Sequence, residues 1–139
     1  MLVAAKWLWY WGPVVGYAGL IFYLSSLPNP TEELPIPDIG DKWLHLIEYA
    51  GLGALCFRAF RLGAAQALSQ RALLLAVIVS SLYGFTDELH QALVPMRESS
   101  WLDVIADTIG AGMGAVLASR VYHGSWGHLC AVPRDRPLS

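Results

Sequence analysis

Long apolar segments leave this chain a narrow choice of folds. The segment from Trp7 to Leu27 contains no Asp, Glu, Lys, Arg or His, and as a helix it is long enough to cross a hydrocarbon core of about 30 Å. Hydrophobic residues make up 55% of the 139 residues and charged residues 14%, against roughly 25% charged residues in a soluble domain. We therefore predict an all-α integral membrane protein.

Three more apolar segments follow the first, so we predict a polytopic membrane protein with a four-transmembrane-helix bundle. The expected spans cover residues 7–27, 43–60, 72–94 and 101–121. The first segment ends in SSLPNP without an Ala-x-Ala cleavage site, which favours a retained helix over a signal peptide. We expect one transmembrane domain over residues 1–122 and a loosely ordered cytoplasmic tail over residues 123–139.

Lysine and arginine are distributed unevenly over the predicted loops and termini. Under the positive-inside rule, the side that holds most of them faces the cytoplasm, which predicts that both termini are cytoplasmic in the cell membrane. Ten of the eleven Asp and Glu fall on the external side, and because acidic residues contribute little to topology, they need another explanation. The cytoplasmic set is Lys6, Arg58, Arg61, Arg71, Arg120, Arg134 and Arg136, against Lys42 and Arg97 outside.

Composition also excludes several classes of function. Two cysteines, Cys56 and Cys130, are too few for a disulfide framework or a four-thiolate metal site. The basic residues form no stripe, so we expect no nucleic-acid partner. Membrane lipids are the expected partners, and the sequence does not indicate an oligomeric state.

Polar residues inside the predicted spans follow the helical repeat. An Asp or Lys at mid-helix costs about 2.5 to 3.5 kcal/mol on insertion, so such residues need a partner, a cavity or a function. Asp41, His45 and Glu48 are spaced i, i+4, i+7 and share one stripe of the second span.

The fourth span repeats the pattern. Asp103 and Asp107 are four residues apart, and their face continues into Gly110 and Gly114, a small-xxx-small pattern that permits close helix approach. We therefore expect both aspartates to face the bundle rather than lipid.

On the third span, Asp87 and Gln91 align, with Glu88 on one flank and His90 on the other. At about 1.5 Å per residue, all three polar stripes lie roughly one to two turns below the external surface. This predicts an outward-facing polar and acidic pocket between three helices. Its candidate catalytic residues are His45, Glu88, Asp103 and Asp107, and its candidate binding residues are Asp41, Lys42, Glu48, Asp87, His90, Gln91 and Arg97, to which the motif resemblance given next adds Tyr49.

Two sequence stretches, DKWLHLIEYAGLG and DELHQALVPMRESSWLDVIADTIGAGMG, resemble the VanZ-like family of small bacterial membrane proteins. The resemblance covers about Asp41 to Gly114. One departure is Met96, where the family often has glycine. A methionine at this position speaks against a tight turn before Arg97. The matching residues are Asp41, Lys42, His45, Tyr49, Glu88, Gln91, Pro95, Arg97, Asp103, Asp107 and Gly110.

The resemblance implies a function in the cell envelope but supplies no reaction. The family takes its name from a member linked to resistance to the glycopeptide teicoplanin. A pocket that binds or acts on an envelope lipid, a cell-wall precursor or a glycopeptide-type drug is consistent with that background. Whether the chain is an enzyme stays open at this point.

Four hypotheses from different classes remain. A lipid-modifying enzyme would use the clustered carboxylates for general acid/base chemistry, with Lys42 and Arg97 holding a phosphate. No cofactor is expected, although a divalent metal is an open alternative. Its candidate ligands are His45, Glu48, Glu88, His90, Asp103 and Asp107.

The remaining three hypotheses involve no enzymatic turnover. A binding or accessory protein would hold a head group or drug without turnover. A proton relay would use the buried acids, but the polarity of the predicted spans stops about halfway across. A structural network would only specify how the helices pack, for example through pairs of His45 with Glu48 or His90 with Asp87.

Overall fold

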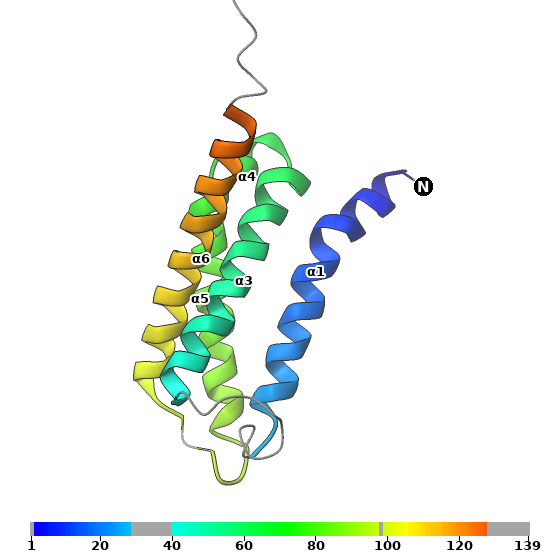
Figure 1. The fold of residues 1–139 in the computed structure, drawn as a ribbon. Coiled ribbons are helices and arrows are strands. Elements are labelled where there is room, and N and C mark those ends of the chain that lie inside the picture. Colours follow the sequence, from blue (N-terminus) through cyan, green and yellow to red (C-terminus); the bar gives the residue numbers. More distant parts are fainter. Residues whose placement is uncertain (1, 29–39, 98, 128–139) are drawn as a thin grey trace, which may run out of the picture.

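A computed structural model describes residues 2–28, 40–97 and 99–127. Over these ranges the chain is helical and has no strand, which confirms the all-α class. Figure 1 shows four long helices that run roughly along one direction and alternate in sense. They are α1 (Leu2–Ser25), α3 (Asp41–Gly63), α5 (Ala72–Gln91) and α6 (Trp101–Gly127), with a one-turn helix α4 (Gln66–Ser69) before α5.

Each long helix overlaps one predicted span, but α5 ends earlier than expected. The sequence favours a helix through Val94, whereas α5 ends at Gln91. The amide of Ala92 still donates to the Glu88 carbonyl, and the next two amides bond three residues back, so the chain tightens into a turn. Because Pro95 disfavours helical backbone in the residue before it, the helix cannot continue to Val94.

The turn after α5 contains the one sequence departure noted above. Met96 has a φ of 66°, in the left-handed region that favours glycine, and it is the only non-glycine residue with a positive φ in the described part of the chain. The tight turn before Arg97 is therefore present, although a methionine occupies its left-handed position. A non-glycine residue there costs about 1–2 kcal/mol.

The closest helix pair is α3 and α6. A Cβ built on Gly110 would collide with the backbone carbonyl of Leu46, and one on Gly114 with that of Ala50. Both glycines thus face α3 at backbone contact, as the small-xxx-small pattern predicts. Helix α3 also packs against α1 and α5, so it is the central element of the bundle.

Two of the four helices satisfy the length and hydropathy expected of a membrane span. They are Ala72–Gln91 and the Trp101–His123 part of α6. Large apolar side chains cover the outer faces of these helices and of α1, for example Leu82, Leu117 and Val15. An apolar exterior around a polar interior is typical of a membrane protein. The four-span count, the cytoplasmic termini and the division into a domain and a tail remain predictions, and residues 128–139 lie outside the described residues.

Candidate functional site

Polar side chains gather at one end of the bundle. At the lower end of Figure 1, α3 and α6 begin while α1 and α5 end, because consecutive long helices run in opposite directions. His45 therefore lies one turn into α3, Asp103 and Asp107 lie in the first two turns of α6, and Glu88 lies one turn before the end of α5. The predicted convergence of three helices is present in the structure.

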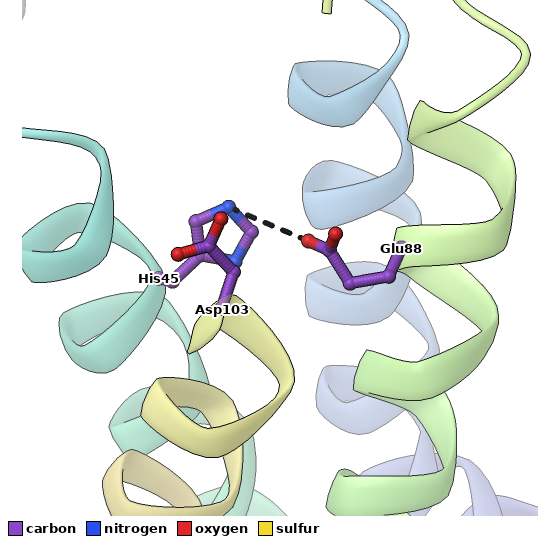
Figure 2. Close-up of side chains that lie close together, drawn as sticks. All are labelled: His45, Glu88 and Asp103. Atoms are coloured by element: carbon purple, nitrogen blue, oxygen red, sulfur yellow. Dashed lines mark ion pairs between the residues drawn. The ribbon is translucent and has the colours of Figure 1, made fainter. Parts of the chain in front are cut away.

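Five of these residues form what we call the His45 cluster: Lys42, His45, Glu88, Asp103 and Asp107. His45 Nδ1 lies 3.0 Å from Asp107 Oδ1, and His45 Nε2 lies 4.0 Å from Glu88 Oε1. Lys42 Nζ donates to Asp103 Oδ1 at 3.1 Å. Figure 2 shows that His45, Glu88 and Asp103 point toward one another from α3, α5 and α6.

The carboxylates of the His45 cluster are almost fully removed from solvent. Exposed fractions are 6% for Glu88, 1% for Asp103 and 0% for Asp107, whereas the Lys42 side chain is 54% exposed. Among the described residues, Glu88 Oε1 and Asp107 Oδ2 have no hydrogen-bond partner. A buried polar atom without a partner is costly, so these two oxygens mark a place where a ligand would be stabilised.

Neighbouring backbone contacts both acids. Glu88 Oε2 accepts a hydrogen bond from the Ser100 amide at 2.8 Å, which ties the end of α5 to the start of α6. Gly84 lies one turn before Glu88, and a Cβ at Gly84 would meet the Asp107 carboxylate. Gly84 therefore makes room for Asp107 between α5 and α6.

A second group joins α5 to α1, and we call it the Ser25 cluster. Its members are Ser25, Ser26, Asp87, His90 and Gln91. Asp87 Oδ2 accepts hydrogen bonds from Ser25 Oγ at 2.8 Å and from Gln91 Nε2 at 2.9 Å. His90 Nε2 lies 3.0 Å from Ser26 Oγ. Asp87 and Gln91 are buried, as the helical repeat predicts, and His90 is half-buried. The contacts of all three run to α1.

Both histidines that the sequence suggests as structural partners make contacts with other helices. His45 Nδ1 is bonded to Asp107 on α6, and His90 contacts Ser26 and stacks on Phe22. Sequence reasoning missed the role of α1, because an apolar segment without charge gives no reason to expect polar contacts. The only signal was the Ser-Ser pair at its end.

The remaining predicted residues lie around the His45 cluster. Tyr49 is fully buried, with its ring stacked on that of His45 at a centroid distance of 6.5 Å. Glu48 and Arg97 are half-buried, and the charge of Arg97 acts on Glu48. The side chain of Asp41 lies outside the described residues.

A small cavity leads from the surface to Glu88. Its volume is about 120 Å³, and it opens between the end of α5 and the start of α6, where Phe85, Ser99, Ser100 and Trp101 join Glu88 in its wall. At the opposite end of the bundle, a larger groove of about 670 Å³ between α3 and α6 is mostly apolar and carries Arg58 and Arg61. A third cavity of about 340 Å³ at that same end is lined by Arg61, Ser69 and Gln70, so polar side chains line cavities at both ends of the bundle.

One family model matches most of the chain. The family model described as VanZ/LLP1 matches residues 9–122. The chain belongs to this family. The match includes the whole His45 cluster and the Ser25 cluster, and it confirms the resemblance carried by the motifs between Asp41 and Gly114. No curated protein and no solved structure matches the chain significantly.

Membership in the VanZ/LLP1 family and the two apolar helices together indicate a membrane protein. The His45 cluster brings together side chains from three helices: Lys42, His45, Glu88, Asp103 and Asp107. Asp87, His90 and Gln91 lie instead in the neighbouring Ser25 cluster. The candidate site thus has two parts, which share α5.

Proposed function

We propose that this VanZ/LLP1 protein binds the polar head group of a cell-envelope lipid or lipid-linked precursor at the His45 cluster, from the outer face of the membrane. The observation that carries the proposal is Glu88. Glu88 lines the 120 Å³ cavity and is 6% exposed. One of its carboxylate oxygens has no hydrogen-bond partner among the described residues. A carboxylate oxygen in that situation accepts a hydrogen bond from a hydroxyl or ammonium group.

The size of the cavity favours a head group over a drug. Pockets for drug-sized molecules have volumes of about 300–1,000 Å³. A cavity of about 120 Å³ suits a phosphate, an amine or part of a sugar, but it is too small for a glycopeptide. The apolar outer faces of α5 and α6 would leave the acyl or prenyl chain in the bilayer, beside the cavity.

The charges of the cluster support a head group with both signs. Lys42 is half-exposed and paired with Asp103, and the buried Nε of Arg97 has no hydrogen-bond partner among the described residues. Both cations can hold a phosphate, and arginine does so through two parallel hydrogen bonds. The carboxylates would accept hydrogen bonds from the rest of the head group.

General acid/base chemistry is a second candidate, favoured by the pairing of His45 with Asp107 at 3.0 Å. When the proton resides on Nδ1, the carboxylate holds the imidazole in one orientation and leaves Nε2 directed toward Glu88. A bound head group beside Glu88 would then meet a histidine prepared to accept a proton.

The test is retention of lipid by the purified full-length chain. In nanodiscs of phosphatidylcholine with a small fraction of phosphatidylglycerol or a polyprenyl phosphate, native mass spectrometry should detect one anionic lipid on the wild type. Arg97→Gln and Lys42→Gln should each weaken retention about tenfold, the effect of losing a charge-assisted hydrogen bond of about 1.5 kcal/mol. Arg120→Gln, at the other end of α6, is the matched control.

Glu88→Gln separates binding from turnover, because the amide keeps the shape but loses acid/base chemistry. If it abolishes a chemical change in the retained lipid while retention persists, the site is catalytic. If the wild type, Arg97→Gln and Arg120→Gln retain lipid equally while only melting temperatures differ, the cluster is a structural network and the proposal is wrong.

A further inference from the structure

Three side chains of the His45 cluster have the composition of a metal site. His45 offers an imidazole nitrogen, and Glu88 and Asp103 each offer a carboxylate oxygen, all within 4.8 Å of one another. We propose that these residues bind one divalent transition-metal ion. One imidazole with two carboxylates suits an ion of intermediate hardness, Zn²⁺ or Mn²⁺, better than Ca²⁺ or Mg²⁺, which prefer oxygen alone.

A separate observation about Glu88 points to a ligand at this place. Its Oε2 is occupied by the Ser100 amide, so only Oε1 is available, and this atom lies 4.0 Å from His45 Nε2. Oε1 has no hydrogen-bond partner in the described part of the chain, although the residue is only 6% exposed. A buried anionic oxygen without a partner carries a desolvation cost that a cation would offset.

The hydrogen bond between His45 and Asp107 orients the imidazole for metal binding. Histidines that bind metals commonly donate their second ring nitrogen to a carboxylate, which fixes the ring and makes the ligating nitrogen more basic. His45 Nδ1 meets Asp107 Oδ1 at 3.0 Å, and Nε2 faces Glu88 in Figure 2. Asp107 would act on the metal through His45 rather than as a direct ligand.

Metal binding requires the three side chains to move closer together. Zinc–ligand bonds of about 2.1 Å in a tetrahedral site place ligand atoms about 3.4 Å apart. The Glu88–His45 separation of 4.0 Å therefore has to shorten by about half an ångström, and the three ligand atoms all lie within 4.8 Å of one another. Three protein ligands leave a fourth position, and one of the three, Glu88, lines the cavity at the start of α6.

The formal charges also balance. Glu88, Asp103 and Asp107 carry three negative charges against one positive charge on Lys42, and a divalent ion would neutralise the remainder. Lys42 competes with the ion for Asp103, but its 54% exposed side chain can turn to solvent. Removal of Lys42 should therefore strengthen metal binding, the opposite of its expected effect on lipid retention.

A head-group oxygen would occupy the fourth coordination position of the metal, and this extension rests on the proposed function. Metal binding itself is measured without lipid. The experiment uses the tag-free full-length chain with Cys130→Ser, so that the tail thiol does not bind zinc. After treatment with a chelator and addition of Zn²⁺ or Mn²⁺ alone, we expect one ion per chain by elemental analysis and titration calorimetry.

Three variants remove direct ligands and two serve as matched controls. His45→Gln, Glu88→Gln and Asp103→Asn should each weaken binding at least tenfold, and Asp107→Asn about tenfold, the usual effect of losing an orienting carboxylate. Asp87→Asn and His90→Gln change the same residue types in the Ser25 cluster and should leave the affinity within about twofold. Lys42→Gln should bind the ion more tightly than the wild type.

The inference is wrong if the wild type binds no stoichiometric ion, or if Glu88→Gln and Asp87→Asn bind it equally well. Should a ligand variant fail to fold, the Lys42→Gln affinity and the metal-induced rise in wild-type melting temperature decide the question. If metal-stripped protein retains lipid and the protein binds no metal, the proposed function holds and the metal site is wrong. If the protein binds metal but retains no lipid, the metal site holds and the proposed function is wrong.

Discussion

His45 Nδ1 on α3 lies 3.0 Å from Asp107 Oδ1 on α6, inside the bundle. This contact links the two most closely packed helices. Hydrogen bonds between membrane helices contribute about 0.6 kcal/mol on average and up to about 1.7. In a double-mutant cycle of His45→Ala and Asp107→Ala, we expect a coupling energy toward the upper value, because both groups are buried. Unfolding in detergent mixtures measures it. A coupling near zero would show that the pair does not stabilise the bundle.

The glycines of α6 allow a sharper test of packing. Gly114→Ala should lower the free energy of unfolding by about 1–3 kcal/mol, because the new methyl group would collide with the Ala50 carbonyl. Gly112→Ala is the control two residues away, since no described atom lies within 4 Å of its Cβ position. The control should be neutral or stabilise by up to about 1 kcal/mol through helix propensity. Equal losses in both variants would contradict the backbone contact between α3 and α6.

Met96 predicts an unusual response to glycine. Met96→Gly removes the left-handed strain of about 1–2 kcal/mol and adds a smaller entropic cost, so stability should stay equal or rise. Met96→Val should destabilise, because a β-branched side chain tolerates a positive φ poorly. Leu93→Gly, in the same turn at 82% exposure, should only lose stability. A thermal unfolding series that places Met96→Gly below Leu93→Gly would disprove the strain.

The Ser25 cluster makes α1 part of the site rather than a simple anchor. Ser25→Ala removes a donor to the buried Asp87 carboxylate and should cost about 1–3 kcal/mol. Thr108→Val is a suitable control, because that hydroxyl bonds only to the Val104 carbonyl of its own helix and is exposed. Chemical denaturation compares the two. Identical losses would mean that α1 docks without this contact.

The predicted orientation can be measured in cells with single cysteines. In a chain with Cys56→Ala and Cys130→Ser, a cysteine at Ser99 should react with a membrane-impermeant maleimide from outside. A cysteine at Gln66, in the exposed α4, should react only after permeabilisation. The reverse labelling pattern would invert the bundle and place the His45 cluster at the cytoplasmic face.

The helical repeat is sufficient to predict which residues face inward, because 100° per residue assigns each position to a side of its own helix. It therefore identifies Asp103, Asp107 and Gly110 as buried. It does not identify the partner across the interface, which depends on how each helix rotates against its neighbours. Asp87 and Glu88 are adjacent in sequence, yet one is bonded to Ser25 of α1 and the other to Ser100, just before α6.

Helix ends were harder to predict than helix faces. The apolar run through Val94 suggests a longer α5, but Pro95 and the turn at Met96 end the helix at Gln91. That early end has a structural consequence, because the chain reverses within a few residues and the Ser100 amide donates to Glu88. Local turn chemistry, rather than hydrophobicity, thus determines where this acid lies.

The glycine contact between α3 and α6 divides the His45 cluster into a rigid part and an adjustable part. His45, Asp103 and Asp107 stand on two helices already at backbone contact, so that pair cannot approach further. Glu88 stands on α5, whose packing against α6 involves side chains. A ligand that draws the cluster together would therefore move Glu88 toward the other two helices, and its arrival could be followed as a distance change between α5 and α3.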